Sequence, residues 1–342
     1  MSKLTTAWYQ GAYWVWLLSP LTLLFWMLSS LRRWAYRRGI FASSKPDAFI
    51  IVVGNISVGG NGKTPVVIAL TKWFQQQKLR VGVLSRGYGG SATTFPHSVS
   101  RTDAASVVGD EPKLIAQRTG APVVIDPKRT RGATSLKNLH KCDVIICDDG
   151  LQHYALQRDI ELVVMDDRGV GNGKLLPMGP LREGKWRLNT IDAIIHNVQT
   201  EGEQAALERV SVPQYAMKLQ GYQCVRVTDQ HTVSIDAFRQ QHDGFTAIAG
   251  IGAPARFFNY LAQLKLSAAK TISFNDHHKF EKADLPQGVV LMTEKDAVKV
   301  EALGHEQCWY LPIEASLPEE FYQQIEKTLP QSILNLRSQN GI

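Results

Sequence analysis

Cysteines are scarce in this sequence, and acidic residues are missing from its N-terminal part. The 342 residues include four cysteines, none at metal-ligand spacing: Cys142, Cys147, Cys224 and Cys308. This excludes a secreted miniprotein held together by disulfides, and a reducing compartment is expected. The chain also lacks a fixed-period repeat and a low-complexity tract. Its composition, 44% hydrophobic and 20% charged, excludes a disordered tail, a collagen-like rod and a coiled coil.

Residues 1–46 contain no Asp or Glu, but they contain six basic residues: Lys3, Arg32, Arg33, Arg37, Arg38 and Lys45. The rest of the chain is nearly balanced, with 32 basic and 31 acidic residues. A nucleic-acid-binding protein should carry its basic surplus on the folded body. The charge pattern therefore predicts contact with a membrane surface and no nucleic-acid partner.

A long uncharged segment lies between Lys3 and Arg32, and residues 14–28 read WVWLLSPLTLLFWML. Five of the eight tryptophans fall within the first 34 residues, and tryptophan favours the boundary between apolar and wet environments. The basic cluster RRWAYRR follows and is expected on the cytoplasmic side, facing anionic headgroups. The segment therefore predicts association with a membrane, with the rest of the chain on its cytoplasmic side.

Two other interpretations of this segment compete with membrane association. A cleaved signal peptide is disfavoured because the basic residues follow the apolar core and no small-residue cleavage site is evident. A core helix of a soluble domain is the second alternative. Whether the segment crosses the membrane or lies at its interface stays open, since serines dilute it and Pro20 favours a kink.

From residue 47 onward, short apolar runs alternate with glycine turns and helical stretches. Strands are expected at 48–55, 80–87, 121–126, 142–150, 160–166 and 192–197, and a helix at 63–77. Continuous Val/Ile runs alternating with helices predict a parallel sheet covered on both faces, hence an α/β fold. We expect a membrane-associated segment at 1–46, a P-loop core at 47–213, a two-stranded linker at 214–230 turning near Gly221, and a smaller α/β lobe at 231–335.

The most specific motif is the glycine-rich loop within IIVVGNISVGGNGKTPVVIAL, residues 50–70. A buried strand, this loop and a following helix form the context of a Walker A phosphate loop, although Ser57 stands where the first glycine is usual. Backbone N–H groups of such a loop wrap a phosphate, and the helix dipole adds positive potential. The predicted nucleotide-binding residues are Ser57, Val58, Gly59, Gly60, Asn61, Gly62, Lys63 and Thr64. Lys63 would contact the β and γ phosphates of ATP, and Thr64 would bind Mg²⁺.

A P-loop also needs a carboxylate at the end of a neighbouring strand. The segment CDVIICDDGLQH supplies Asp148 and Asp149 directly after an apolar run. The alternative for this pair alone is an ordinary Asp-Asp-Gly turn. Beside a P-loop, the pair is predicted to lie at the magnesium site.

These motifs resemble those of the tetraacyldisaccharide 4′-kinase family, which consists of membrane-bound P-loop kinases. The matching segments are VGNISVGGNGKTP, LSRGYGG, VGDEP, DPKRTRG, CDDGLQH, LLPMGPLREG, AGIGAPARFF, FNDHHKF and TEKDAVK, in the family's order between about residues 50 and 300. The resemblance implies a P-loop core and a smaller C-terminal α/β lobe joined by a β-ribbon. It also implies ATP-dependent phosphorylation of the 4′-hydroxyl of a tetraacyldisaccharide 1-phosphate, giving lipid IVA. No obligate protein partner is implied.

The resemblance also assigns roles to single residues. It places Asp110 and a histidine of the C-terminal lobe in the catalytic centre with Lys63, favouring His277 over its neighbour His278. It implies magnesium contacts for Asp148 and Glu183 in addition to Thr64. It implies substrate or phosphate contacts for Tyr88, Glu111, Arg129, Asp149, Gln152, His153 and Arg182. For each of these side assignments, a surface ion pair or a turn is the alternative.

Two other function classes stay open from the sequence. A P-loop GTPase or metallochaperone would normally carry an Asn/Thr-Lys-x-Asp motif for guanine. The segment TEKD at 293–296 has Lys295 and Asp296 adjacent, which is the wrong spacing. A membrane-anchored nucleotide-binding scaffold without chemistry would transfer no phosphate to a glycolipid.

Overall fold

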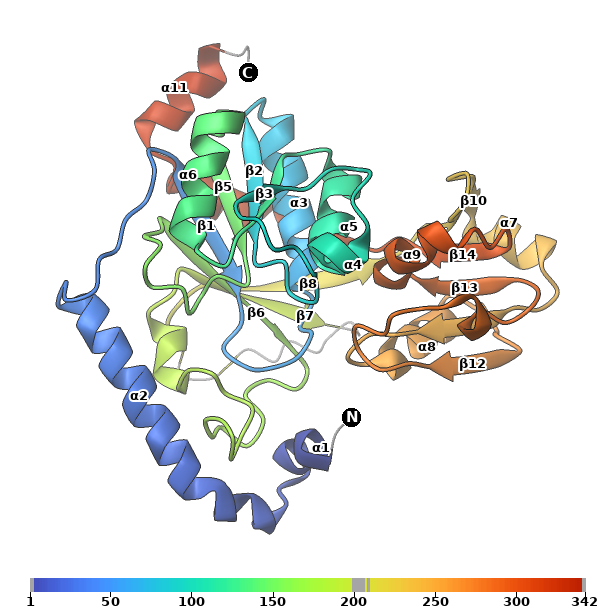
Figure 1. Cartoon of the computed structure of the whole chain (residues 1–342), viewed down its shortest axis with the longest axis horizontal. Coiled ribbons are helices and arrows are strands. Elements are labelled where there is room, and N and C mark those ends of the chain that lie inside the picture. The colour runs from blue at the N-terminus through green and yellow to red at the C-terminus, as the bar shows by residue number, and fades with distance from the viewer. Residues whose placement is uncertain (1–2, 199–206, 208–209, 340–342) are drawn as a thin grey trace.

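The fold contains two sheets, seen side by side in a computed structural model that describes residues 3–198, 207 and 210–339 (Figure 1). The larger sheet has nine strands in the order β15-β8-β7-β6-β1-β5-β2-β4-β3. Its strands are β1 Phe49–Gly54, β2 Val81–Ser85, β3 His97–Ser98, β4 Val123–Ile125, β5 Val144–Asp148, β6 Ile160–Asp166, β7 Ala193–Val198, β8 Gln214–Gln220 and β15 Glu314–Ser316. The seven strands from β8 to β4 are parallel, and only the edge strands β3 and β15 are antiparallel. The predicted parallel α/β core is therefore confirmed.

Helices cover both faces of this sheet because its central strands are apolar on both sides. Ile51 and Val53 of β1 pack on one face with α3 Lys63–Gln76, α5 Asp110–Thr119, α10 Glu319–Lys327 and α11 Gln331–Gln339. Ile50 and Val52 pack on the other face with α6 Arg129–His140 and the 3₁₀ turn η2 Lys185–Asn189. A short helix, α4 Ala105–Val108, precedes α5. The glycine-rich loop leaves β1 at the carboxyl edge of the sheet, where ligands of such folds bind.

The smaller lobe is built on a six-stranded sheet of order β10-β9-β14-β13-β11-β12. Its strands are β9 Gln223–Arg226, β10 Thr232–Ser234, β11 Thr246–Ala249, β12 Lys270–Ser273, β13 Val290–Thr293 and β14 Cys308–Leu311. Its helices are α7 Ile235–Gln241, α8 Pro254–Gln263, α9 Glu294–Val300, and the 3₁₀ turns η3 Lys282–Asp284 and η4 Glu301–Leu303.

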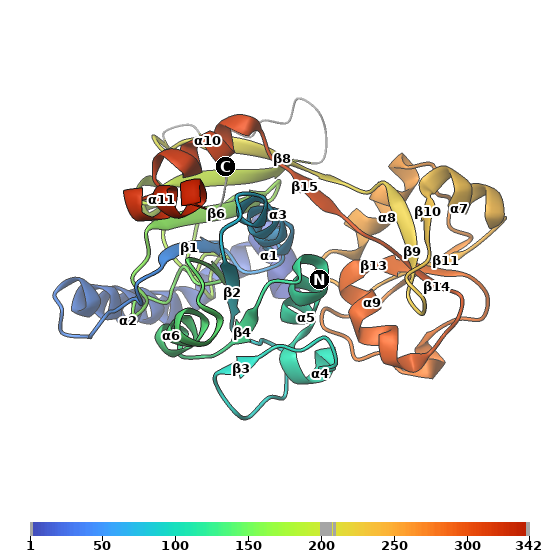
Figure 2. The same ribbon diagram turned by 90° about the horizontal axis from the view of Figure 1, so that it is seen from above.

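The connection between the lobes differs from the predicted hairpin at Gly221. Strands β8 and β9 do not pair with each other; β8 pairs with β15 in the large sheet, and β9 pairs with β14 in the small one. The ribbon therefore consists of two chain passages running in opposite directions between the lobes, as Figure 2 shows from above. A turn-like Gly221 could not reveal this, because the partner strands lie about ninety residues later.

The predicted C-terminal boundary of the small lobe is also wrong. Residues 314–339 return to the large sheet, where Phe321, Ile325 and Ile333 are buried in the core beneath β1. These residues follow the small lobe in sequence, but they pack on the large sheet because their apolar side chains are buried there. The small lobe is thus an insertion between β8 and β15.

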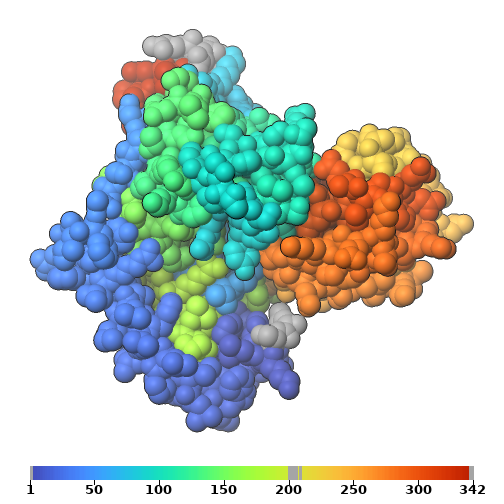
Figure 3. Space-filling model, in the orientation of Figure 1, coloured from blue at the N-terminus to red at the C-terminus, as the bar shows by residue number. Residues whose placement is uncertain are grey.

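The N-terminal segment forms α1 Lys3–Gln10, the 3₁₀ turn η1 Tyr13–Leu18 and α2 Ser19–Arg37, on the lower left of the molecule (Figure 3). Pro20 lies in the first turn of α2, where its missing N–H costs no helical bond, so the expected kink within the helix is absent. The stretch Tyr13–Arg37 is long and apolar enough to cross a membrane, and only 6% of its most apolar window is buried. The apolar side chains of α2 therefore face outward on most sides, and a core helix is excluded.

Candidate active site

The glycine-rich loop, residues 55–62, joins the end of β1 to the start of α3. Gly59 and Gly62 have φ angles of +109° and +90°, which side-chain-bearing residues rarely adopt. A Cβ at Gly62 would lie 2.7 Å from Asn197 Nδ2, so space as well as backbone conformation requires glycine there. The predicted nucleotide-binding residues 57–64 therefore lie together at the carboxyl edge of the sheet.

Lys63 points at the end of β5, where its Nζ lies 3.5 Å from Asp149 Oδ1. Arg182 donates to both oxygens of Asp149, at 3.3 and 3.1 Å. Burial alone would raise the pKa of Asp149, but Lys63 and Arg182 together lower it. Three of the predicted site residues are thus brought together, and the ionised Asp149 orients the lysine of the phosphate loop.

Asp148 is the more deeply buried member of the aspartate pair, at 2% exposure. Burial first, and then the nearby Glu111, raise its pKa to about 7. Its Oδ1 atom is buried and finds no hydrogen-bond partner among the described residues. A buried oxygen without a partner is costly unless something else satisfies it. In the part of the chain that is described, Asp148 therefore has a buried carboxylate oxygen without a partner at the end of β5, next to β1 and the loop that follows it.

Glu183 is buried and lies in a different arrangement from the one expected of a metal ligand. Its carboxylate accepts hydrogen bonds from the Tyr154 hydroxyl and from Gln152 Nε2, the latter at 2.9 Å. Gln152 also donates to the Asn55 carbonyl at 3.2 Å, which links this group to the phosphate loop. In the described parts of the chain, no three His, Cys, Asp or Glu side chains are grouped to hold an ion. Direct metal binding by Glu183 would need Tyr154 or Gln152 to release it.

Arg129 occupies a different place from the substrate surface that was expected. It is 2% exposed, and it donates to the carbonyls of Asp126, at 3.2 Å, and Asp148, at 3.0 Å. Its guanidinium therefore supports the backbone at the end of β5, although its buried Nε has no hydrogen-bond partner among the described residues. His153 lies nearby, and burial, followed by the charge of Arg129, lowers its pKa to about 4.

Asp110 and His277 meet across the two lobes. His277 Nδ1 lies 3.2 and 3.1 Å from the two oxygens of Asp110, although 166 residues separate them in the chain. The hydrogen bond that His277 donates to Asp110 raises the pKa of His277. Burial alone would raise the pKa of Asp110, but His277 and Lys295 lower it. Tyr88 packs edge-on against the imidazole, with ring centroids 5.2 Å apart.

Comparison with known proteins decides the family. A profile described as tetraacyldisaccharide-1-P 4′-kinase matches residues 14–330. The chain belongs to this family. Curated relatives named tetraacyldisaccharide 4′-kinase include one from Pseudoalteromonas atlantica, 49% identical over 90% of this chain and 97% of the relative. Another, from Pasteurella multocida, is 46% identical over 92% of this chain and 94% of the relative. A crystal structure of LpxK from Aquifex aeolicus, described as in complex with ATP, has a TM-score of 0.80 at 27% identity, covering 92% of this chain and 99% of that one.

The structure of this kinase separates the two candidate histidines. His278 Nε2 lies 3.0 Å from Asp284 Oδ2 of its own lobe, and its ring stacks on Phe274. His277 alone faces Asp110. The two neighbours diverge because His277 adopts a positive φ of 58°, which turns successive side chains in different directions.

Lys295 was given no role from the sequence, yet it lies at the centre of the kinase's charged cleft. Its Nζ is 3.1 Å from Glu111, 3.7 Å from Asp110 and 3.6 Å from Asp276. Burial alone would lower the pKa of Lys295, but the three carboxylates raise it strongly. The cation therefore links both lobes beside the Asp110–His277 pair. The signal for this role in the sequence is the position of Lys295 in TEKD, directly after the buried strand β13.

A second link between the lobes reaches the phosphate loop. Arg256 of α8 donates to Asp166 at 2.8 Å and also pairs with Asp167. Asp166 in turn pairs with Arg168 at 2.7 Å, and Arg168 donates to the Gly60 carbonyl at 3.0 Å. The signal in the sequence is the segment MDDRG at 165–169, an aspartate pair at the end of a buried strand.

Proposed function

We propose that this kinase transfers the γ-phosphoryl group of ATP to the 4′-hydroxyl of a tetraacylated glucosamine disaccharide 1-phosphate, forming lipid IVA. The observation that carries this proposal is the contact between Asp110 and His277, which come from different lobes and meet beside the phosphate loop. Family membership supplies the reaction, and this contact supplies an acceptor for the hydroxyl proton.

Nucleotide binding is assigned to residues 57–64. Lys63 is half-buried and already oriented by Asp149, so its cation can meet the phosphate oxygens without a search over rotamers. The glycines of the loop adopt positive φ angles without strain, which allows its backbone N–H groups to approach the phosphates closely. Positioning and neutralisation of charge are the main demands of phosphoryl transfer.

Asp148 and Thr64 are proposed as the protein ligands of Mg²⁺. The unpartnered Oδ1 of Asp148 fits such an ion, and Mg²⁺ usually takes only one or two protein ligands with waters and phosphates completing the shell. Magnesium bound there would neutralise charge on the phosphate oxygens. Glu183 already accepts a hydrogen bond from Gln152, so we assign it the supporting role of holding Gln152 against the phosphate loop.

His277 is proposed as the proton acceptor and Asp110 as the group that orients it. Because Nδ1 faces the Asp110 carboxylate, Nε2 is the nitrogen that would accept the proton; its nearest carboxylate oxygen is Asp276 Oδ1, at 3.9 Å, which is beyond hydrogen-bond distance. The 4′-hydroxyl proton passes to Nε2 as its oxygen attacks the γ-phosphorus. Asp110, kept ionised by Lys295, then stabilises the imidazolium. Exposed Tyr88, against the same ring, suits a contact with the sugar.

Membrane association is assigned to α1, η1 and α2, and we place the kinase on the cytoplasmic face of the inner membrane. The large apolar side chains of α2, such as Leu23 and Leu31, are more than half exposed, and a cytoplasmic membrane surface suits the arginines that follow them. Deleting residues 1–40 should release the protein from membranes and lower turnover on lipid, while ATP binding persists. Sedimentation of the truncated protein with membranes would refute this assignment.

The deciding test is an assay with radiolabelled ATP and the purified lipid acceptor. Label in a product phosphorylated at the 4′-position supports the proposal. Hydrolysis of nucleotide without transfer to any glycolipid would favour a scaffold. A preference for GTP over ATP would favour the GTPase alternative, which the contacts of Lys295 with three carboxylates already disfavour.

A further inference from the structure

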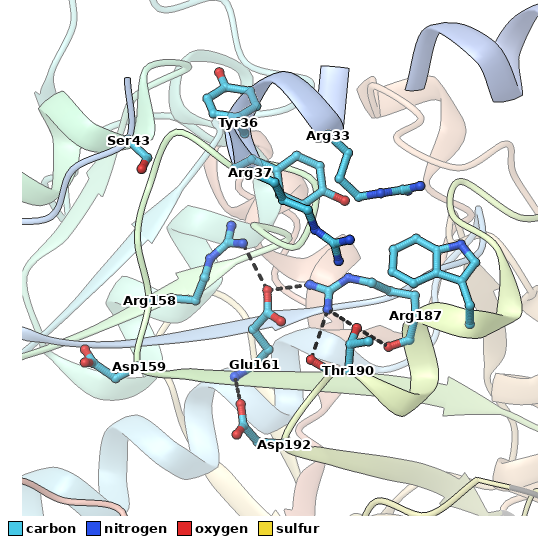
Figure 4. A pocket seen from close by; sticks show the side chains of 12 residues that line it. Arg33, Tyr36, Arg37, Ser43, Arg158, Asp159, Glu161, Arg187, Thr190 and Asp192 are labelled. Carbon is cyan, nitrogen blue, oxygen red and sulfur yellow. Dashed lines mark hydrogen bonds and ion pairs between the residues drawn. The ribbon is translucent and has the colours of Figure 1, made fainter. Parts of the chain in front are cut away.

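A polar cavity of about 380 Å³ separates α2 from the kinase core. It lies between the C-terminal part of α2, the 3₁₀ turn η2 and the first residues of β6 and β7. Figure 4 shows the guanidinium groups of Arg33, Arg37, Arg158 and Arg187 around one space. Trp186 also lines it. None of the catalytic or nucleotide-binding residues proposed above lines this cavity.

The carboxylates of this cavity are already engaged. Glu161 accepts from Arg158 at 3.0 Å and also from Arg187. Asp159 pairs with Lys45, and Asp192 accepts from the Glu161 backbone N–H at 2.7 Å. Within the described ranges, Asp192 thus keeps its charge unpaired, but the four arginines of the lining still outnumber its three carboxylates.

Arg33 and Arg37 supply the surplus positive charge. Within the part of the chain that the structure describes, neither guanidinium has a carboxylate at ion-pair distance, whereas both lie over an aromatic ring. Arg33 lies 4.1 Å and Arg37 5.9 Å from the centroid of Trp186. Stacking fixes the plane of a guanidinium and leaves its N–H edge free for a planar or tetrahedral anion.

The position of the cavity relative to the apolar side chains of α2 indicates which anion it could bind. Leu24, Leu28 and Leu31 are exposed on the preceding turns of α2, so the surface next to the cavity is apolar. A helix of this kind lies with its apolar side chains among acyl chains and its terminal arginines among headgroups. The helix is also held to the core, since the Met178 N–H donates to Thr22 Oγ1 at 3.1 Å. The cavity thus opens at headgroup level in a fixed orientation.

We propose that this cavity binds the phosphate group of a membrane-lipid headgroup through Arg33 and Arg37, with Arg187 and Arg158 behind them. The site would set the orientation of the kinase on the membrane, and it rests on the membrane association proposed above. The phosphate has two sources on such a surface: an anionic phospholipid, or the 1-phosphate of the acceptor itself. Both present the same group at the same depth.

A matched pair of variants tests the site in the full-length kinase. Arg33→Gln/Arg37→Gln removes two charges that line the cavity, and Arg32→Gln/Arg38→Gln removes two from the same cluster that do not. Binding is measured to vesicles of phosphatidylcholine, alone or mixed with phosphatidylglycerol. Both double variants lose long-range attraction to the anionic vesicles, which should lower the binding affinity about five-fold per charge removed. The cavity pair should lose at least about ten-fold more on the anionic vesicles, because it also loses charge-assisted hydrogen bonds.

Equal losses for the two pairs, or a wild-type kinase that binds both vesicle types equally, would exclude a phospholipid as the occupant. The proposal is then overturned unless the acceptor assay below separates the two pairs. Failure of the wild type to bind either vesicle would refute the proposal together with the membrane association on which it rests. Thermal unfolding shows whether each variant is folded. If the cavity pair is not, Arg37→Gln and Arg38→Gln are compared singly, with the same expected order.

Turnover in nonionic micelles distinguishes the two sources of phosphate. If phospholipid fills the site, the cavity pair changes the KM for acceptor only when phosphatidylglycerol is present. If the acceptor's 1-phosphate fills the site, the cavity pair has a higher KM for acceptor than the wild type even without phospholipid. This difference in KM disappears with an acceptor that lacks the 1-phosphate. Either result supports the cavity. A KM that follows the control pair in every condition would overturn it.

Discussion

Removing either Asp110 or His277 should disable the same step, because one hydrogen bond joins them. Asp110→Asn keeps the size of the side chain but removes the negative charge that faces His277 Nδ1 at 3.1 Å. His277→Ala removes the proton acceptor itself. The two single variants and the double variant form a cycle that measures how strongly the two residues act together.

The expected sizes follow from the contact. A hydrogen bond to a charged group contributes about 1.5–3 kcal/mol, so Asp110→Asn should lower kcat roughly 10- to 100-fold. Loss of a general base costs about 10²- to 10⁴-fold, the range expected for His277→Ala. Without an imidazole, Asp110 has nothing left to orient. The double variant should therefore resemble His277→Ala rather than the product of the two single losses.

The pH dependence gives an independent readout. Neutral imidazole accepts the proton, so kcat falls as the pH drops through the pKa of His277. Asp110 raises that pKa, so Asp110→Asn should move the acid limb to lower pH. The assay is kcat at saturating ATP and lipid across pH for each variant.

His278→Ala is the matched control, because His278 bonds to Asp284 and not to Asp110. It should leave the acid limb where it is in the wild type. Multiplicative losses in the double variant, or an acid limb that Asp110→Asn does not move, would refute the paired role.

Three further predictions concern the loop, the lobes and acid stability. Lys63→Ala should lower kcat about 10²- to 10³-fold, because the cation that stabilises the transferring phosphoryl group is lost. The variant should stay folded, because Arg182 still pairs with Asp149. Wild-type turnover would contradict the P-loop assignment. Arg256→Gln should cost about 1 kcal/mol of unfolding free energy or less in denaturant titrations, since Asp166 keeps Arg168. It should nevertheless lower kcat roughly ten-fold, because His277 lies on the lobe that Arg256 anchors, and an unchanged kcat would exclude this link. His153 has a folded pKa of about 4 against 6.5 in the unfolded chain, so its contribution to stability is full above 6.5 and lost as the pH falls. Between about pH 6.5 and pH 5 the wild type should therefore lose roughly 1–2 kcal/mol more unfolding free energy than His153→Gln loses; equal pH slopes would contradict this.

Sequence alone was sufficient where the physical signal is local. The buried Val/Ile runs predicted six of the nine strands of the large sheet. The order strand, glycine loop, helix predicted a phosphate loop at 57–64, which the structure has at the sheet's carboxyl edge. The uncharged segment before Arg32 predicted an exposed apolar helix. These features depend on hydrophobic period, backbone freedom and charge, all of which are set within a few neighbouring residues.

Tertiary structure decided whatever depends on residues far apart in the chain. Only packing shows that Arg129 lies under β5, that His277 rather than His278 meets Asp110, and that Lys295 joins three carboxylates between the lobes. The return of β15 to β8 also has no local signal, because a three-residue edge strand has too little pattern to identify its partner. These contacts form when apolar faces such as that of α10 are buried on the sheet, and the energy that fixes them comes from surfaces that the sequence separates by a hundred residues or more.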